Sequence, residues 1–317
     1  MLLLRFPMEA WGVVLALGSA ALVALMARVG VLDHPGPRSS HSRPVPKGGG
    51  VGIVAASLVG FAALGGPVLP RTVMALGGLV VAGLGFWDDR RDFSAGMKLL
   101  VQYVAAMVPV MAGMIPDLTH DYALDAAIVV AWVLLVTNAV NFMDGLNGLS
   151  AGTAAIAAVG AGMSGLWGLV DGFVAGIVGF LPWNFPRARI FMGDVGSQFC
   201  GYVVALLAVL GVNGPHPLLV PFALAGLLFD VIFTLIRRFW AGEPITKAHR
   251  GHLYQFANRT GMPAAAVTSV HWGFAAWGVW LGWLPWHIWE VAAVVVPQLV
   301  WTAMVVARTR SRPAGSW

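Results

Sequence analysis

The sequence predicts an all-α integral membrane protein, a polytopic bundle of about eleven transmembrane helices. Of its 317 residues, 58% are hydrophobic and only 10% are charged, whereas a soluble globular domain usually carries about 25% charged residues. Apolar runs of membrane-spanning length also recur along the whole chain. A soluble fold could not bury so much apolar surface, so we expect a single transmembrane domain over residues 1–317.

Each predicted span has a length close to the 17 to 25 or so apolar residues that a helix needs to cross the hydrocarbon core. The spans are 9–29, 49–66, 71–87, 97–115, 121–141, 147–166, 169–185, 196–212, 216–237, 264–285 and 288–307. The break between the sixth and seventh spans depends on Gly165, Gly168, Asp171 and Gly172 alone.

The basic residues indicate the orientation of the chain. With eleven spans and a cytoplasmic C-terminus, all of the 19 Lys and Arg residues except Arg5 and Arg71 lie on the cytoplasmic side. The positive-inside rule therefore predicts an N-terminus outside the cytoplasm, which is the periplasmic side where the membrane is a bacterial inner membrane. The same loops account for the formal charge of +5 without a nucleic-acid partner. The apolar stretch after Arg5 continues to Met26, which favours an uncleaved first span over a signal peptide.

The predicted cytoplasmic loops lie near residues 30–48, 88–97, 142–147, 186–195 and 238–263. The first is rich in proline, ends in three glycines at the start of the next span, and carries Arg38, His41 and Lys47. Backbone N–H groups at a glycine-rich helix start can approach an anion closely. The alternative is a basic loop that only orients the protein.

The second loop begins with two adjacent acids, Asp88 and Asp89, at the end of an apolar helix. Carboxylates at membrane depth are costly and are typical of functional sites. A divalent cation would relieve their mutual repulsion. The alternative is a solvated helix end with ion pairs to Arg90 and Arg91, although acids at a helix C-terminus oppose the helix dipole.

The third and fourth loops each add an acid. In the third, polar residues recur every three positions and would form one stripe on a helix; they are Asn138, Asn141, Asp144 and Asn147. The alternative is amide hydrogen bonding between helices. In the fourth loop, Arg187 and Arg189 precede Asp194, which is flanked by glycines. The alternative for Asp194 is a helix N-cap.

The fifth loop groups His249, Arg250 and His252 near Lys247. His and Arg side chains so placed suit phosphate binding. A zinc site is a weak alternative, because no further Cys or His lies nearby. Asp230, inside the apolar segment before this loop, is expected to meet a cation or a polar partner.

All five loops reach one face by the parity of the crossings. Asp88 lies 56 residues before Asp144, which lies 50 residues before Asp194, so two membrane passes separate each acid from the next. A bundle could bring these acids together beside Arg, Lys and His side chains. Such a surface suits Mg²⁺ and a phosphorylated substrate.

The loops carry the segments RSSHSRPVPKGGG, DDRRDFS, NFMDGLNGL, RIFMGDVGS and HRGHLYQ, in this order between residues 33 and 255. On these segments the sequence resembles the polyprenyl-phosphate N-acetylhexosamine-1-phosphate transferases of glycosyltransferase family 4. The five motifs in register make the match specific. The resemblance implies a catalytic domain in which an oxygen of undecaprenyl phosphate attacks the β-phosphate of a UDP-sugar. UMP would leave, and a polyprenyl diphosphate sugar would remain.

The resemblance also implies residue roles. Asp88, Asp89 and Asp144 match catalytic acids, and Asp194 with Asp89 would hold Mg²⁺, with Mn²⁺ as the alternative metal. Positions that match substrate-binding residues are Arg38, His41, Lys47, Lys98, Asn141, Asn147, Arg189, His249, Arg250 and His252. Whether Asp88 is a general base or only orients the acceptor stays open, since a phosphate monoester has a second pKa of about 6. Asn147 stands where the family usually has a further acid.

The segments DDRRDFS and HRGHLYQ look most like those of the enzymes that initiate O-antigen and common antigen, which implies an N-acetylhexosamine donor such as UDP-GlcNAc. The peptidoglycan phospho-MurNAc-pentapeptide transferase is the alternative. That enzyme usually has a lysine at the place of Asp92 and a run of histidines at 249–252. A transporter or flippase would have its charges near the bilayer midplane, and most charges here lie at one surface. The sequence leaves open whether the protein forms a homodimer.

Overall fold

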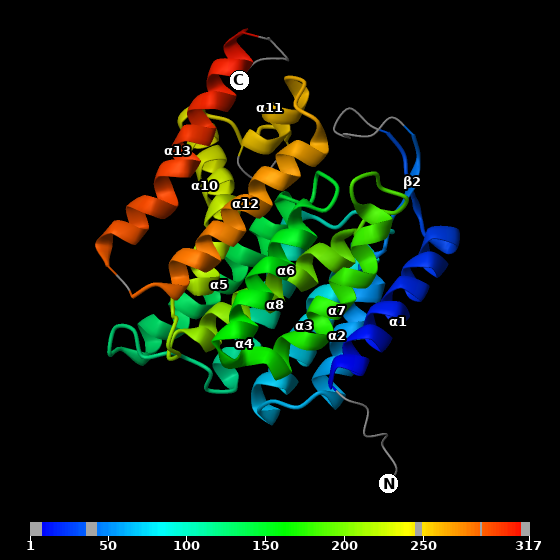
Figure 1. Cartoon of the computed structure of the whole chain (residues 1–317), viewed down its shortest axis with the longest axis vertical. Helices are drawn as coiled ribbons and strands as arrows, with labels where there is room; N and C mark the ends of the chain where they lie inside the picture. The colour runs from blue at the N-terminus through cyan, green and yellow to red at the C-terminus, as the bar shows by residue number, and fades with distance from the viewer. Residues whose placement is uncertain (1–7, 36–42, 245–248, 286, 312–317) are drawn as a thin grey trace.

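Helices make up most of the chain that the computed structural model describes, which covers residues 8–35, 43–244, 249–285 and 287–311. In Figure 1 they run between two ends of the molecule: α1 begins at the lower end of the view and α13 ends at the upper end. The helices are α1 (Met8–Val29), α2 (Gly50–Ala63), α3 (Val68–Asp88), α4 (Ala95–Met111), α5 (Tyr122–Phe142), α6 (Leu149–Ala161), α7 (Trp167–Asn184), α8 (Asp194–Gly211), α9 (Leu219–Ala223), α10 (Ala225–Trp240), α11 (Leu253–Arg259), α12 (Ala264–Trp283) and α13 (Ile288–Ser311). Two short antiparallel strands, β1 (Leu32–Asp33) and β2 (Val45–Pro46), lie between α1 and α2.

The described helices confirm a helical membrane protein. Six helical segments are long and apolar enough to cross a bilayer: Ala10–Val29, Val68–Asp88, Tyr122–Phe142, Leu149–Asn184, Asp194–Gly211 and Ile288–Ser311. Two shorter apolar helices, α2 and α4, accompany them. Length and composition identify these segments, so the number of eleven crossings and their orientation stay predictions.

The segment from Leu149 to Asn184 is a hairpin of two helices, α6 and α7. As one straight helix of 36 residues it would be about 54 Å long. Its two ends instead meet, because the N–H of Gly148 donates to Oδ1 of Asn184 at 2.6 Å. The chain reverses through a π-helical turn, Gly162–Leu166, in which Gly165 has φ 109°. That left-handed conformation suits glycine, and the turn lies where the glycines predict the break.

Two predicted spans differ from the observed helices. The predicted span 49–66 ends early, at Ala63, because Gly65 and Gly66 have φ of 97° and 83°, outside helical geometry. The predicted span 216–237 is two helices, α9 and α10, with Leu224 between them. Pro221, which has no N–H to donate to a helix hydrogen bond, lies three residues before that break.

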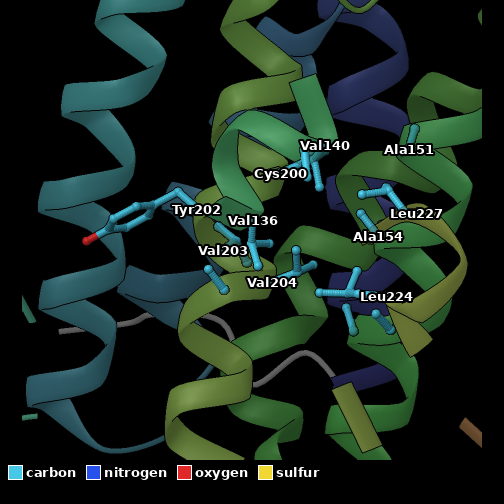
Figure 2. Close-up of a cluster of buried hydrophobic side chains, with 14 of the residues drawn as sticks. Val136, Val140, Ala151, Ala154, Cys200, Tyr202, Val203, Val204, Leu224 and Leu227 are labelled. Atoms are coloured by element: carbon cyan, nitrogen blue, oxygen red, sulfur yellow. The ribbon is translucent and has the colours of Figure 1, made fainter. Parts of the chain in front are cut away.

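Helix α8 is the most enclosed of the candidate spans: 83% of its apolar window is buried, against 17% for α1. Figure 2 shows its side chains, including Cys200, Val203 and Val204, packed among residues of α5, α6 and α10. Dense packing of this kind leaves little room for movement. The first residue of this central helix is Asp194, so a predicted site residue stands on the most enclosed helix of the bundle.

Candidate active site

Five loops meet at one end of the bundle, the upper end in Figure 1, where β2, α11 and the end of α13 lie. They are loop 1 (residues 30–49), loop 2 (89–94), loop 3 (143–148), loop 4 (185–193) and loop 5 (241–263). Loops 1 and 4 pair through a parallel bridge between Lys47 and Phe191, whose backbone N–H donates to the carbonyl of Pro46 at 2.8 Å. Loop 3 contacts loop 4 through Asn147 Nδ2, which donates to the carbonyl of Pro186 at 3.1 Å.

A close helix crossing brings loop 2 to the start of α8. Gly85, on the last turn of α3, lies so near the backbone of Asp194 and Val195 that no side chain fits between them. Gly50 lies equally near the backbone of Gly196. Small residues at such crossings let membrane helices approach closely. The two aspartates that follow Gly85 therefore lie beside the first turn of α8.

Asp89, the first residue of loop 2, caps α8. Its carboxylate accepts the N–H groups of Asp194 at 3.2 Å and Val195 at 3.4 Å, and Lys47 Nζ lies 3.5 Å from it. A carboxylate at a helix N-terminus satisfies free amides and interacts favourably with the dipole. Burial raises the pKa of Asp89, and the Lys47 ammonium acts in the opposite direction. The alternative that Asp194 is the N-cap residue of α8 is wrong, because Gly193 occupies that position and provides no side-chain cap.

Lys98 joins Asp88 to Asp194. Its ammonium pairs with Oδ2 of Asp88 and lies 3.4 Å from Oδ2 of Asp194, while Oδ1 of Asp88 accepts the N–H of Phe93 at 2.9 Å. The predicted ion pairs with Arg90 and Arg91 are not found among the described contacts; the Arg90 guanidinium lies over the ring of Phe86 instead. One cation thus holds two acids from different helices at one place.

The polar stripe that runs from α5 into loop 3 makes three kinds of contact. Asn141 Nδ2 donates to Oδ1 of Asp194 at 3.1 Å and to Ser197 Oγ at 2.8 Å. Asn138 bonds Gln102 of α4 at 2.7 Å, which is the interhelical amide contact that the alternative expects. Asn147 holds loop 4. Only Asn141 reaches the acids directly.

Asp144 lies close enough to Asp194 and Asp89 to feel their charges. Among the described residues no hydrogen bond or ion pair reaches its carboxylate, which is partly buried. Burial, followed by the charges of Asp194 and Asp89, raises its pKa well above the usual range. A further positive charge beside Asp144 would relieve this repulsion.

In loop 5 the predicted residues have different surroundings. His252 is buried, and its Nδ1 lies 3.1 Å from Oδ1 of Asp230. His249 and Arg250 are partly exposed, and the His249 ring stacks on that of His252 at 4.9 Å. Burial and then the neighbouring His252, Arg238 and Arg237 lower the pKa of His249 to about 4. His249 is therefore neutral near pH 7 and can offer a hydrogen bond but not a charge.

The remaining predicted residues are more scattered. The Arg189 guanidinium lies over the ring of Trp183, 5.9 Å from its centre. Arg38, His41 and Lys247 lie outside the described residues. The acids, the two lysines and Asn141 thus form one cluster, and Tyr254 of loop 5 contacts Phe142 beside it.

Ser197 and Tyr254 were missed by the sequence reasoning. Ser197 follows Asp194 by three residues and so shares its helix face, a spacing that could have identified it. The Tyr254 hydroxyl donates to the carbonyl of Phe142 at 3.0 Å and so links loop 5 to loop 3. Tyr254 lies within the quoted segment HRGHLYQ, but no pattern in the sequence predicts this partner.

The acids suit a hydrated divalent cation better than a closed metal cage. Among the described residues there is no group of three or more His, Cys, Asp or Glu side chains arranged to hold a metal. Mg²⁺, however, keeps several waters and commonly binds through one or two carboxylates plus substrate phosphates. Asp144 lacks a cationic partner among the described residues and feels the charge of Asp194, so it is a carboxylate that can bind Mg²⁺ in this way.

The fold and the cluster together define a class of protein: a helical membrane enzyme with acids, lysines and amides at the end of its bundle, as transfer of a phosphorylated group requires. A family model described as glycosyl transferase family 4 matches residues 71–212, the segment from α3 to α8. That segment contains Asp88, Asp89, Asn141, Asp144 and Asp194.

Known proteins share this similarity over most of the chain. A Bacillus subtilis protein described as a probable undecaprenyl-phosphate N-acetylglucosaminyl 1-phosphate transferase is 33% identical over 248 residues, covering 72% of this chain and 69% of that protein. Decaprenyl-phosphate N-acetylglucosaminephosphotransferase of Mycobacterium tuberculosis is 30% identical over 283 residues, covering 73% and 69%. The phospho-N-acetylmuramoyl-pentapeptide-transferase of Mycobacterium leprae is 33% identical over 262 residues, covering 62% and 73%.

The chain belongs to glycosyl transferase family 4, among the polyprenyl-phosphate N-acetylhexosamine-1-phosphate transferases. It is an enzyme that transfers a sugar phosphate to a polyprenyl phosphate.

Proposed function

We propose that the enzyme transfers an N-acetylhexosamine 1-phosphate, such as GlcNAc 1-phosphate, from a UDP-sugar to undecaprenyl phosphate, with Mg²⁺ as cofactor. The observation that carries the proposal is the cluster in which Lys98 holds Asp88 and Asp194 together, with Asp144 close enough to Asp194 to feel its charge. The relatives named for N-acetylglucosaminyl phosphate transfer support this donor class. The product would begin a cell-envelope glycan such as O-antigen.

In this reaction an oxygen of the acceptor phosphate forms a bond to the β-phosphorus of the donor. The bond from that phosphorus to the bridging oxygen breaks, and UMP leaves with the bridging oxygen. The acceptor phosphate is already largely ionised near neutral pH, with a second pKa of about 6. Asp88, tied to the ammonium of Lys98, therefore has the task of holding Lys98 toward the acceptor phosphate rather than removing a proton.

The acids would hold Mg²⁺ through Asp194 and Asp144, with Asp89 fixing the first turn of α8 behind them. When bound, the ion would neutralise charge on the diphosphate as UMP departs. Asn141, which donates to Asp194, would keep that carboxylate in place for the ion.

Metal affinity is expected to fall as the pH is lowered toward the raised pKa of Asp144. Protonated Asp144 cannot bind a cation, so the metal ion must displace its proton. A higher proton concentration at low pH therefore weakens metal binding. Binding of Mn²⁺ followed by electron paramagnetic resonance at several pH values measures this directly. Asp144→Asn removes the titrating group and should weaken binding and flatten its pH dependence. An affinity that is constant with pH in the wild-type protein would contradict the assignment.

Purified enzyme with Mg²⁺, undecaprenyl phosphate and radiolabelled UDP-GlcNAc is expected to form a labelled lipid that extracts into butanol. Parallel reactions with other UDP-N-acetylhexosamines and with UDP-MurNAc-pentapeptide identify the donor. Turnover of the pentapeptide donor alone would favour the peptidoglycan alternative, which the similarity to the Mycobacterium leprae enzyme keeps open. Absence of labelled lipid with every donor would remove the proposal.

The proposal places the site on the cytoplasmic face of a bacterial inner membrane, since the eleven predicted spans put nearly all Lys and Arg residues of the sequence on the side of the five loops. UDP-sugars do not cross a bilayer, so sealed inside-out vesicles should make product and sealed right-side-out vesicles should not. Activity confined to right-side-out vesicles would reverse the orientation.

A further inference from the structure

Asp230 lies outside the acid cluster, yet it has more hydrogen-bond donors than any acid in it among the described contacts. It lies on α10, is only 1% exposed, and accepts four hydrogen bonds. The N–H groups of Leu253 and Tyr254 donate at 2.9 Å each. His252 Nδ1 lies at 3.1 Å and the Thr234 hydroxyl at 3.2 Å. A carboxylate is buried in an apolar helix only at high cost unless it is fully bonded in this way.

Three of these donors come from loop 5, so Asp230 fixes the place where that loop returns to the bundle. Leu253 and Tyr254 provide the first amides of α11, which the carboxylate of α10 caps. Because an ionised carboxylate only accepts, His252 must donate from Nδ1, which fixes its ring orientation. The His249 ring in turn stacks on that of His252. The orientation of the His249–His252 segment thus depends on Asp230.

Asp230 also acts on loop 3, through Tyr254. Tyr254, whose N–H is bound by Asp230, donates its hydroxyl to the carbonyl of Phe142 at 3.0 Å. The hydroxyl also lies so near Gly145 that a side chain there would collide with it. Phe142 and Gly145 lie on either side of Asp144 in the sequence. One carboxylate therefore supports both the histidine segment and the loop that carries Asp144.

We propose that Asp230 is a positioning residue of the UDP-sugar site: it acts through α11 to hold the His249–His252 segment against the loop that carries Asp144, without touching substrate. The proposal rests on the proposed function, since it takes these two segments as the edge that binds the donor diphosphate. It assigns to a buried acid of α10 an effect on donor affinity and none on the acceptor lipid.

Asp230→Asn keeps the size of the side chain but replaces one accepting oxygen with an NH₂ group, which would face an N–H of α11. Hydrogen bonds to a charged acceptor are stronger than bonds to a neutral one, so loosening of α11 is expected. The KM for the UDP-sugar should rise about tenfold or more, as 1.4 kcal/mol corresponds to a factor of ten. The KM for undecaprenyl phosphate should stay within about twofold. Hydrogen exchange in peptides covering 249–260 and 141–147 should become faster.

The matched control is Asp125→Asn. Asp125 is 2% exposed and accepts the N–H groups of Leu118 and Thr119 at 3.1 Å each and the Thr119 hydroxyl at 2.8 Å. It lies in the first turn of α5, about 25 Å along that helix from Phe142. This variant should lose a comparable amount of stability and keep the wild-type KM for the donor. An equal rise in donor KM in both variants would mean that general destabilisation is the cause and would overturn the proposal.

Tyr254→Phe provides a second variant if Asp230→Asn does not fold in detergent. It removes the hydroxyl that bonds Phe142, leaves α11 capped by Asp230, and should also raise the donor KM, by a smaller factor. Wild-type donor KM in the folded variants, with unchanged exchange in both peptides, would overturn the proposal. If the wild-type enzyme makes no lipid product from any UDP-sugar, the proposed function fails instead. The exchange measurement then still tests whether Asp230 orders the two segments.

Discussion

Asp194→Asn is expected to lower the transfer rate by about 10²–10³-fold, the loss usual when one group that stabilises transition-state charge is removed. Asp194 receives Asn141 at 3.1 Å and Lys98 at 3.4 Å, and its charge helps to raise the pKa of Asp144. Asparagine keeps the shape of the side chain but loses the charge that would attract the cation. The backbone N–H of residue 194 still reaches Asp89, so the cap of α8 remains.

The measurement is the initial rate of labelled lipid formation at saturating substrates, together with the melting temperature in detergent. Asp117→Asn serves as control, because Asp117 is exposed and pairs only with His120 among the described contacts. The control should retain wild-type rate and stability. Retention of half or more of the activity by a folded Asp194→Asn protein would exclude Asp194 from the metal site.

Gly85→Ala is expected to move Asp88 and Asp89 away from Asp194 and to reduce both the stability and the activity of the enzyme. The added methyl group would meet the backbone carbonyl of Asp194 and the N–H of Val195. Backbone atoms cannot turn aside as a side chain can, so α3 must move away from α8. Overpacking of this kind typically costs about 1–3 kcal/mol. The shift would carry Asp89 away from the amides it caps, and we expect at least a tenfold fall in transfer rate.

The same helix offers a matched control in Gly83→Ala. Nothing lies within 4 Å of a methyl group built at Gly83, and alanine favours helix more than glycine by about 1 kcal/mol. This variant should be as stable as wild type or slightly more so, with unchanged activity. Thermal unfolding and the lipid assay measure the stability and the transfer rate of both variants. Equal behaviour of the two would show that the close crossing at Gly85 does not hold the acids in place.

Composition and apolar length suffice to predict a helical membrane protein, because the cost of unpaired backbone groups in a bilayer leaves few other folds. The α6–α7 turn was predictable because glycine is the residue that tolerates the φ of Gly165. The break at Leu224 was not predicted, since an apolar run that contains Pro221 looks the same whether the helix continues or bends.

The positions of the candidate acids were also predictable, because carboxylates at the ends of apolar helices have few structural reasons to occur there. The hydrogen-bond partners of these acids could not be predicted. Asp89 binds the amides of α8, and Asp230 binds those of α11, only because particular helices cross at particular depths. Local sequence patterns describe one helix at a time and contain no signal for such a pairing.

The lone cysteine has a practical consequence for labelling. Cys200 lies on α8 in the packed interior of the bundle and has no exposed surface; Figure 2 shows the neighbouring side chains. Thiol reagents attack accessible thiolates, so maleimide dyes and spin labels should leave the folded wild-type enzyme unmodified. A second thiol introduced at an exposed loop position would then carry the only reporter group, and conformational measurements could be made without first replacing a core residue.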